Sequence, residues 1–286
     1  MRVLGTAQDG GLPHASCSCV RCETARDDPA RRRFVSSLAL VSPGGTVHLF
    51  DATPDIREQL DLLRDLREPQ GRVDRSPLGS VWLTHAHMGH YTGLAFFGFE
   101  AMHTRGLDLF CSASMADFLR NNGPWSQLVE MGNVSLREVA PGQSTSLDGG
   151  LTVTAIKVPH REEYSDTLGF VFDGGARRVL FVPDTDAWRA WDPSLTDRLS
   201  DIDVALLDGT FYSAAELPGR DVSEIGHPLI TDTMDLLEPL VSASGLEVYF
   251  THLNHSNPAL DPASPERGEI ERRGFHVLED GQQLPL

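Results

Sequence analysis

Three histidines follow one apolar run, and this feature most limits the folds open to the chain. Residues 81–83 are apolar, the run stops at Thr84, and His85, His87 and His90 come next. Residues i and i+2 of an extended chain point to the same side, so His85 and His87 leave the strand end as a pair. Imidazole binds zinc, iron, copper and nickel. The cluster therefore predicts a metal site at the end of a buried strand, with a surface cluster of histidines as the alternative.

Polar side chains also follow several later strands that are expected from apolar or alternating runs. They are His160, Asp184, Asp208 and His252, after expected strands at 151–158, 178–182, 202–207 and 248–250. Strands that all deliver ligands at one edge build a site there. Strands and helices in two successive halves predict a layered α/β architecture and exclude a helix bundle or an all-β fold.

Helical patterns are expected in four stretches, and a loop rich in Pro, Gly and Arg is expected before Leu78. The stretches are residues 56–66, 93–104, 115–121 and 265–273. Ser114 is the expected N-cap of the third, since its hydroxyl can accept a hydrogen bond from the first turn. No linker or repeat interrupts the 286 residues. We therefore expect one domain spanning residues 1–286.

A compact cysteine motif lies near the N-terminus, within a stretch of about residues 13–33 that is expected to be a loop. Cys17, Cys19 and Cys22 have the spacing C-x-C-x2-C. Three thiolates within a tight turn are typical of a structural zinc site that takes one more ligand from elsewhere. Three small core residues and a redox switch are the alternatives. The histidines considered for the fourth position are His14, His255 and His276.

Charge and hydropathy narrow the class of partner. The net charge of -17 argues against nucleic acid as a main partner, because phosphate binding requires Lys and Arg. An anionic small substrate stays open, since metal ions can supply local positive charge. No apolar run approaches the ~20 residues of a membrane span, and the first residues do not form a signal peptide. A cytoplasmic protein with a small-molecule substrate is expected. A homodimer is compatible with the sequence, which does not give the oligomeric state.

The ligand pattern resembles that of the metallo-β-lactamase superfamily, whose signature is H-x-H-x-D-H followed by a His, an Asp and a last His at later strand ends. The resemblance covers essentially the whole chain and implies an αββα sandwich with a metal site at one edge of the two sheets. It implies that one metal is held by the first group of histidines, that a second is held by another pair, and that an aspartate bridges both. The residues in these roles are His85, His87 and His160, then His90 and His252, then Asp184.

One position departs from the signature. The aspartate of the motif falls at Gly89, which has no side chain. The departure removes one ligand from the second site. The sequence therefore predicts one complete metal site and one weakened or altered site.

Two subgroups of the superfamily resemble this chain. The opening G-T-x4-G-x-P and C-x-C-x2-C motifs are similar both to the pyrroloquinoline quinone biosynthesis protein B family and to the phosphodiesterase of phosphonate breakdown. The segment T-H-L-N-H-S-N-P-A-L at 251–260 resembles the first, and the intact histidine triplet resembles the second. In the second subgroup the last His of T-H-x-x-H binds the structural zinc, which implies His255 as the fourth ligand here. We interpret the chain as similar to the first family, with a more complete metal site.

Three functions are compatible with these residues. The first is a metal-dependent hydrolase in which a metal-bound hydroxide attacks a small ester, phosphodiester or lactone. Asp184 would bridge the metals or orient the nucleophile, and His227 would contact substrate or simply begin a helix. Asp186 and Asp208 would support ligand histidines or have plain loop roles.

The second function follows from the resemblance alone: iron- and oxygen-dependent hydroxylation of a tyrosine-derived precursor in pyrroloquinoline quinone biosynthesis. The third is a non-catalytic carrier on the same scaffold. The ligand set accepts Zn²⁺, Mn²⁺ or Fe²⁺, as one or two ions, beside a structural Zn²⁺ at the cysteines. The sequence does not decide between hydrolysis and oxidation.

Overall fold

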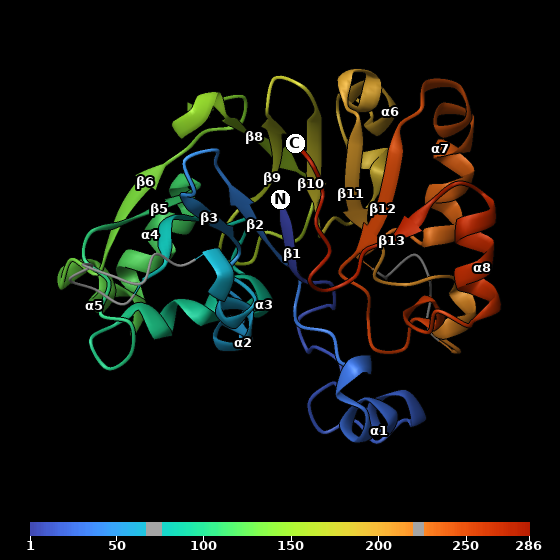
Figure 1. Ribbon diagram of the computed structural model, residues 1–286, viewed down its shortest axis with the longest axis horizontal. Helices are drawn as coiled ribbons and strands as arrows, with labels where there is room; N and C mark the ends of the chain where they lie inside the picture. The colour runs from blue at the N-terminus through green and yellow to red at the C-terminus, as the bar shows by residue number, and fades with distance from the viewer. Residues whose placement is uncertain (67–75, 220–225) are drawn as a thin grey trace.

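Two mixed β-sheets form the centre of the molecule (Figure 1). The computed structural model describes residues 1–66, 76–219 and 226–286. The first sheet has the strand order β1-β2-β3-β4-β5-β6 and the second has the order β13-β12-β11-β10-β9-β8-β7. The strands of the first sheet are β1 (Arg2–Gly5), β2 (Ser37–Val41), β3 (Val47–Phe50), β4 (Leu78–Trp82), β5 (Leu107–Cys111) and β6 (Val134–Glu138). The strands of the second are β7 (Ser144–Ser146), β8 (Thr152–Val158), β9 (Thr167–Asp173), β10 (Arg178–Val182), β11 (Val204–Asp208), β12 (Glu247–Thr251) and β13 (His276–Val277).

The inner faces of the two sheets pack through aromatic side chains. Phe50 and Trp82 of the first sheet lie 5.3 and 5.8 Å from Phe170 of the second, measured between ring centroids. All three side chains are fully buried. Such aromatic pairs add about 0.5–1.5 kcal/mol to the free energy gained by burying their area. The sheets are therefore held face to face by a dry core.

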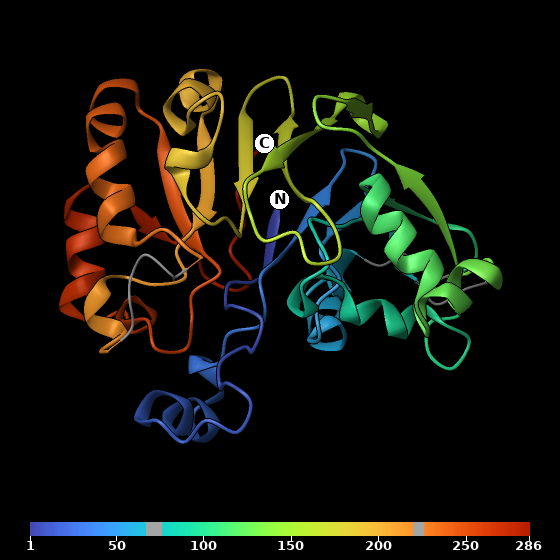
Figure 2. The ribbon, with the colours of Figure 1, turned by 180° about the vertical axis from the view of Figure 1, so that it is seen from behind.

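Helices cover the outer face of each sheet, as Figures 1 and 2 show from opposite sides. The first sheet packs on α2 (Ile56–Asp61), α3 (Met88–Tyr91), α4 (Ala113–Asn121) and α5 (Trp125–Glu130), and the second on α6 (Leu195–Arg198), α7 (Ile230–Ser244) and α8 (Pro265–Arg272). The expected αββα sandwich is confirmed. Helix α1 (Val20–Asp27) lies in a lobe that projects from one end of the sandwich in both views.

Two local expectations were wrong. Residues 93–104 do not form a helix: a 3₁₀ turn at Thr92–Phe97 follows α3, and the chain then folds back as the Met102 and Thr104 amides donate to Phe96 and Phe97 carbonyls. The close approach of Gly93 to the backbone of Thr53 holds this segment against the first sheet. The N-cap of α4 is Ser112, whose hydroxyl accepts from the Met115 amide, and not Ser114.

Helix α7 was not anticipated from the sequence. Its buried residues Ile230, Thr233, Met234 and Leu237 have the spacing of one helix face. Pro239 lies inside the helix, where proline normally signals an end. The stretch 13–33 is likewise not a loop throughout, since α1 lies within it. The loop expected before Leu78 falls largely on residues 67–75, outside the described ranges.

The expected strand at residues 178–182 coincides with β10 and is confirmed. β10, β11 and β12 run parallel, so their carboxyl ends meet at one edge of the second sheet. None of the helices in the described part of the chain is long and apolar enough to cross a membrane.

Candidate metal centre

Five imidazoles surround one carboxylate oxygen where the two sheets meet. His85, His87 and His90 follow β4, and the other ligand candidates follow β8, β10 and β12. The carboxylate is that of Asp184, which is 3% exposed. Its Oδ2 lies 3.1 Å from His160 Nε2, 3.4 Å from His85 Nε2, 3.8 Å from His87 Nδ1, 3.8 Å from His252 Nε2 and 3.9 Å from His90 Nε2. The structure thus brings together all six active-site residues that the sequence singled out.

The donors divide into overlapping groups. The ligand atoms of one group lie within 4.8 Å of one another and belong to His85, His87, His160 and Asp184. A second group of the same compactness contains His90, His252 and Asp9. A third contains Asp184, Asp208, His227 and His252. Asp9 was not recognised from the sequence.

The ring nitrogen of each ligand candidate that faces away from the centre has a hydrogen-bond partner. His90 Nδ1 donates to Asp51 Oδ2 at 2.7 Å, and His160 Nδ1 donates to Asp186 Oδ1 at 2.7 Å. His87 donates in the opposite sense, from Nε2 to Glu163 Oε2 at 3.0 Å. In a neutral ring, such an acceptor holds the proton on the outward nitrogen and so leaves the lone pair on the nitrogen that faces the centre.

Two threonines orient the remaining rings. The Thr84 hydroxyl donates to Asp51 and so accepts from His85 Nδ1 at 2.9 Å. The Thr210 hydroxyl donates to Asp208 and accepts from His252 Nδ1 at 2.9 Å. Both histidines therefore present Nε2 as an acceptor, as a metal requires. Asp186 and Asp208, whose roles the sequence left open, are placed as supports of histidines.

Several donor atoms at the centre are buried and have no hydrogen bond within the described ranges. They are Nε2 of His85, His90 and His252, and Oδ1 of Asp9 and Asp184. Each buried polar atom left unpaired costs about 1–3 kcal/mol. A divalent cation bound between these atoms would remove that cost, and the imidazole and carboxylate donor set suits one. The residues therefore fit a divalent metal.

The protonation states of Asp184 and His85 favour a cation, whereas that of His90 opposes one. Burial raises the pKa of Asp184, but the imidazoles of His252, His227 and their neighbours outweigh it and hold that pKa well below its usual value. Burial and His90 hold the pKa of His85 well below its usual value, so His85 is neutral. Burial lowers the pKa of His90, yet Asp51 outweighs this and raises it well above its usual value. A metal at His90 must therefore displace a proton.

His227 lies at the side of the centre. Its Nδ1 is 2.8 Å from Asp208 Oδ2 and 3.3 Å from Asp184 Oδ1. Burial lowers the pKa of His227, but the carboxylates of Asp208 and Asp184 outweigh it and raise the pKa to about 9. His227 is therefore an imidazolium at neutral pH and can donate a proton.

Backbone strain coincides with the centre. Asp51 and His252 adopt left-handed φ angles of 65° and 60°, which cost non-glycine residues of the order of 1–3 kcal/mol each. Sequence reasoning also missed Asp51. Its position directly after β3 matches the strand-end pattern of the other site residues and could have indicated it.

The three sulfurs of the cysteine motif lie within 4.8 Å of one another in the projecting lobe. Cys22 is buried and Cys19 is exposed. Burial, reinforced by Cys19 and Cys17, raises the pKa of the Cys22 thiol to about 12. The cluster offers three of the four ligands of a structural zinc site.

The structure places two of the three proposed fourth ligands beside each other near this lobe. The ring of His14 packs edge-on against that of His255, with centroids 4.4 Å apart, and the His14 amide donates to Cys22 Sγ at 3.3 Å. His255 Nδ1 is buried without a hydrogen bond in the described residues. The ligand atoms that lie within 4.8 Å of one another are the three cysteine sulfurs, and no histidine nitrogen is among them. His255 as the fourth ligand therefore stays a proposal. His276 packs instead on Tyr249.

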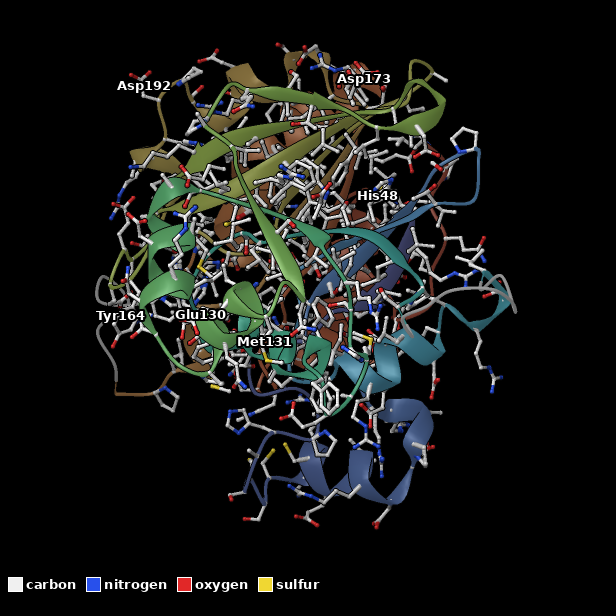
Figure 3. All side chains as sticks on the ribbon, turned by 90° about the vertical axis from the view of Figure 1, so that its left-hand side faces the viewer. His48, Glu130, Met131, Tyr164, Asp173 and Asp192 are labelled. Carbon is white, nitrogen blue, oxygen red and sulfur yellow. The ribbon has the colours of Figure 1, made fainter. Side chains whose placement is uncertain are left out.

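A pocket of about 620 Å³ includes Glu163 in its lining, and none of the candidate metal ligands is among its described lining residues. Acidic side chains predominate among its charged lining residues, which are Glu138, Glu162, Glu163 and Asp166. Tyr164 also lines it and is 68% exposed (Figure 3). Because Glu163 accepts from His87, the cavity wall is joined directly to the candidate ligands.

Comparison with known proteins places this arrangement in a family. The family model described as the β-lactamase superfamily domain matches residues 46–260. Coenzyme PQQ synthesis protein B of Methylobacterium sp. (strain 4-46) is 31% identical over 99% of both chains. Among solved structures, Zn²⁺-bound PqqB from Methylobacterium extorquens has a TM-score of 0.83 at 26% identity, over 100% of this chain and 99% of that one.

A diphosphatase of the PhnP family has the same fold, with a TM-score of 0.71 at 22% identity over 100% of this chain and 96% of that one. These likenesses cover the chain from end to end. They include the strand ends that carry the metal centre and the lobe that carries the cysteines.

Proposed function

Because this chain belongs to the metallo-β-lactamase superfamily and, within it, to the family of coenzyme PQQ synthesis protein B, we propose that it is a metal-dependent enzyme, and specifically a hydrolase of a small ester, phosphodiester or lactone. One observation carries the proposal. Five imidazoles lie 3.1–3.9 Å from Asp184 Oδ2, each with a hydrogen-bond partner on its outward ring nitrogen.

The proposal assigns each group a task. A divalent metal, when bound, supplies a Lewis acid and lowers the pKa of a water molecule from 15.7 to about 7 in favourable zinc sites. Asp184 is charged and central, so it holds the ligand histidines at a fixed spacing. His227 donates the proton that a leaving group requires, and Asp208 holds its ring by Nδ1 at 2.8 Å. The matched hydrogen-bond partners keep every ring in the required tautomer.

The pocket that includes Glu163 does not select the charge of the substrate. Three of its four carboxylates are paired with a cation: Glu138 with Arg120, Glu162 with Lys157 and Glu163 with Arg161. An ester, a lactone and a phosphodiester therefore stay equal candidates.

A second candidate function is favoured by the relatives. Their name assigns them to coenzyme PQQ synthesis, and the identity of 31% to one of them extends over 99% of both chains. For this chain the corresponding proposal is an iron- and oxygen-dependent hydroxylation. The same imidazoles and carboxylate suit iron.

Metal analysis of protein purified without added metal separates the two. Zinc or manganese at the histidine centre with turnover of p-nitrophenyl acetate, homoserine lactones or bis-p-nitrophenyl phosphate supports the hydrolase. Iron with oxygen consumption in the presence of a tyrosine-containing peptide supports the oxygenase. Protein that holds zinc at the cysteines alone contradicts both and leaves a carrier. Asp184→Asn serves as the matched inactive control.

A further inference from the structure

The place where the superfamily motif has an aspartate is filled in this chain by a different residue. A Cβ added to Gly89 would lie 2.1 Å from Asp9 Oδ1 and 2.8 Å from Asp9 Cγ. Real Cβ atoms essentially never approach a heavy atom this closely. A side chain at residue 89 and the carboxylate of Asp9 therefore compete for the same space.

Backbone contacts fix the position of Asp9. The Gln8 amide donates to the Leu253 carbonyl at 2.9 Å, and Ala7 forms a parallel bridge with Leu253. The amide of Gly11, which has a left-handed φ of 67°, closes a turn onto the Gln8 carbonyl. The loop is therefore joined to the residue that directly follows His252. This joint carries the Asp9 side chain to the second group of histidines.

The distances suit a shared ion. Asp9 Oδ1 lies 3.5 Å from His90 Nε2 and 3.7 Å from His252 Nε2. Ligand atoms 2.0–2.2 Å from a tetrahedral ion are about 3.4 Å apart. All three atoms are buried and none has a hydrogen bond in the described part of the chain. Three buried ligand atoms that lie this close together without hydrogen bonds suit a shared metal ion.

We propose that Asp9 is the carboxylate ligand of the second metal ion, in the place that the side chain missing at Gly89 leaves open. The second site is then complete and not weakened, and its acid comes from a loop eighty residues away in the chain. The inference rests on the metal centre used by the proposed function.

Counting ions tests the proposal without reference to turnover. Mn²⁺ is the probe, since it prefers oxygen and nitrogen over thiolate. The wild type is expected to bind two Mn²⁺ at the histidine centre, with an electron paramagnetic resonance spectrum of a coupled pair. Asp9→Asn is expected to bind one tightly, with the uncoupled six-line spectrum and a Kd for the second raised by at least about 100-fold, beyond the 10–100-fold typical of groups that only support a ligand. Asp27→Asn removes the same charge from the exposed end of α1 and should bind as the wild type.

A second test moves the carboxylate from residue 9 to residue 89 and measures whether two coupled ions are bound again. Asp9→Gly combined with Gly89→Asp is expected to recover the coupled pair, after the loop shifts by a few tenths of an ångström to relieve the 2.8 Å approach to Cα of residue 9. Gly89→Asp with Asp9 retained should not give the coupled pair, since the two side chains would occupy the same space. A double variant that stays at one ion contradicts the shared position.

The outcomes separate this inference from the function. Two coupled ions of unchanged affinity in Asp9→Asn overturn the inference and leave the hydrolase standing. A wild type that binds no ion at the histidines overturns both. Retained binding of the first ion in Asp9→Asn shows in the same titration that the variant is folded.

Discussion

The histidine centre and the cysteine cluster are two metal-binding regions built in opposite ways. The centre collects its donors from the ends of four strands and from the loop that carries Asp9, and its rings have hydrogen-bond partners such as Asp51 and Asp186. The cysteine cluster takes three donors from six consecutive residues at the start of α1. The donors of the first are held in place by hydrogen bonds between side chains of different strand ends, whereas the three sulfurs of the second meet within one short segment. Catalysis requires the first arrangement, because ligands must stay in place while the substrate changes.

Substitution of Asp184 tests whether the histidine centre and the cysteine cluster bind metal independently, and we expect it to have the largest effect. Asp184→Asn removes the one oxygen that all five imidazoles approach. We expect loss of metal from the histidine centre and a fall of kcat/KM by at least about 1,000-fold, since the charge stabilisation at stake is several kcal/mol and 1.36 kcal/mol is tenfold. Zinc at the cysteines should be retained. Exposed Asp117→Asn is the control, and loss of all zinc in Asp184→Asn would contradict independence.

The converse change is expected to remove one ion. Cys22→Ser takes a buried sulfur from the cluster, so zinc content should fall by about one ion per chain while metal at the histidine centre remains. His255→Ala should match it if His255 is the fourth ligand, and His14→Ala should match it if His14 is. His276→Ala, whose ring packs on Tyr249, is the control. Unchanged zinc content in His255→Ala excludes that assignment.

Substitution of a residue that only hydrogen-bonds to a ligand histidine is expected to have a smaller effect on metal affinity. Asp51 accepts from His90 Nδ1 at 2.7 Å and from the Thr84 hydroxyl. Asp51→Asn should weaken binding of the second metal by about 10–100-fold while the first is retained. Isothermal titration with Mn²⁺ measures both affinities. Asp148→Asn, which disturbs His48 away from the centre, should change neither.

The pH dependence of zinc binding tests the cysteine cluster separately from the histidine centre. The pKa of Cys22 is raised to about 12, so its thiol is protonated in the metal-free lobe at neutral pH. Binding displaces that proton, and zinc affinity should therefore rise with pH by about tenfold per pH unit for each proton released. Chelator competition between pH 6.5 and 8.5 measures the slope. Zinc affinity that is the same at pH 6.5 and pH 8.5 would contradict a thiol origin.

The architecture and most of the candidate ligands could be predicted because their signals are local. His85 and His87 share a side by the period of the strand, and Cys17, Cys19 and Cys22 meet through their spacing alone. The strands that precede Asp184 and His252 could be predicted from short apolar runs that end in a polar residue. Helix α7 had a readable pattern too, but Pro239 inside it concealed the pattern.

The sequence by itself thus determined that this protein has an αββα sandwich, a set of inward-facing imidazoles and a separate thiolate cluster. It could also show that an acid is missing at Gly89. Only the tertiary structure decided that Asp9 occupies that place and that Asp51 holds His90. The reason is physical. A carboxylate contacts a histidine or a metal ion only when its oxygens lie close to it in space. For residues far apart in the chain, that distance is set by how the sheet and the N-terminal loop pack, which the sequence does not show.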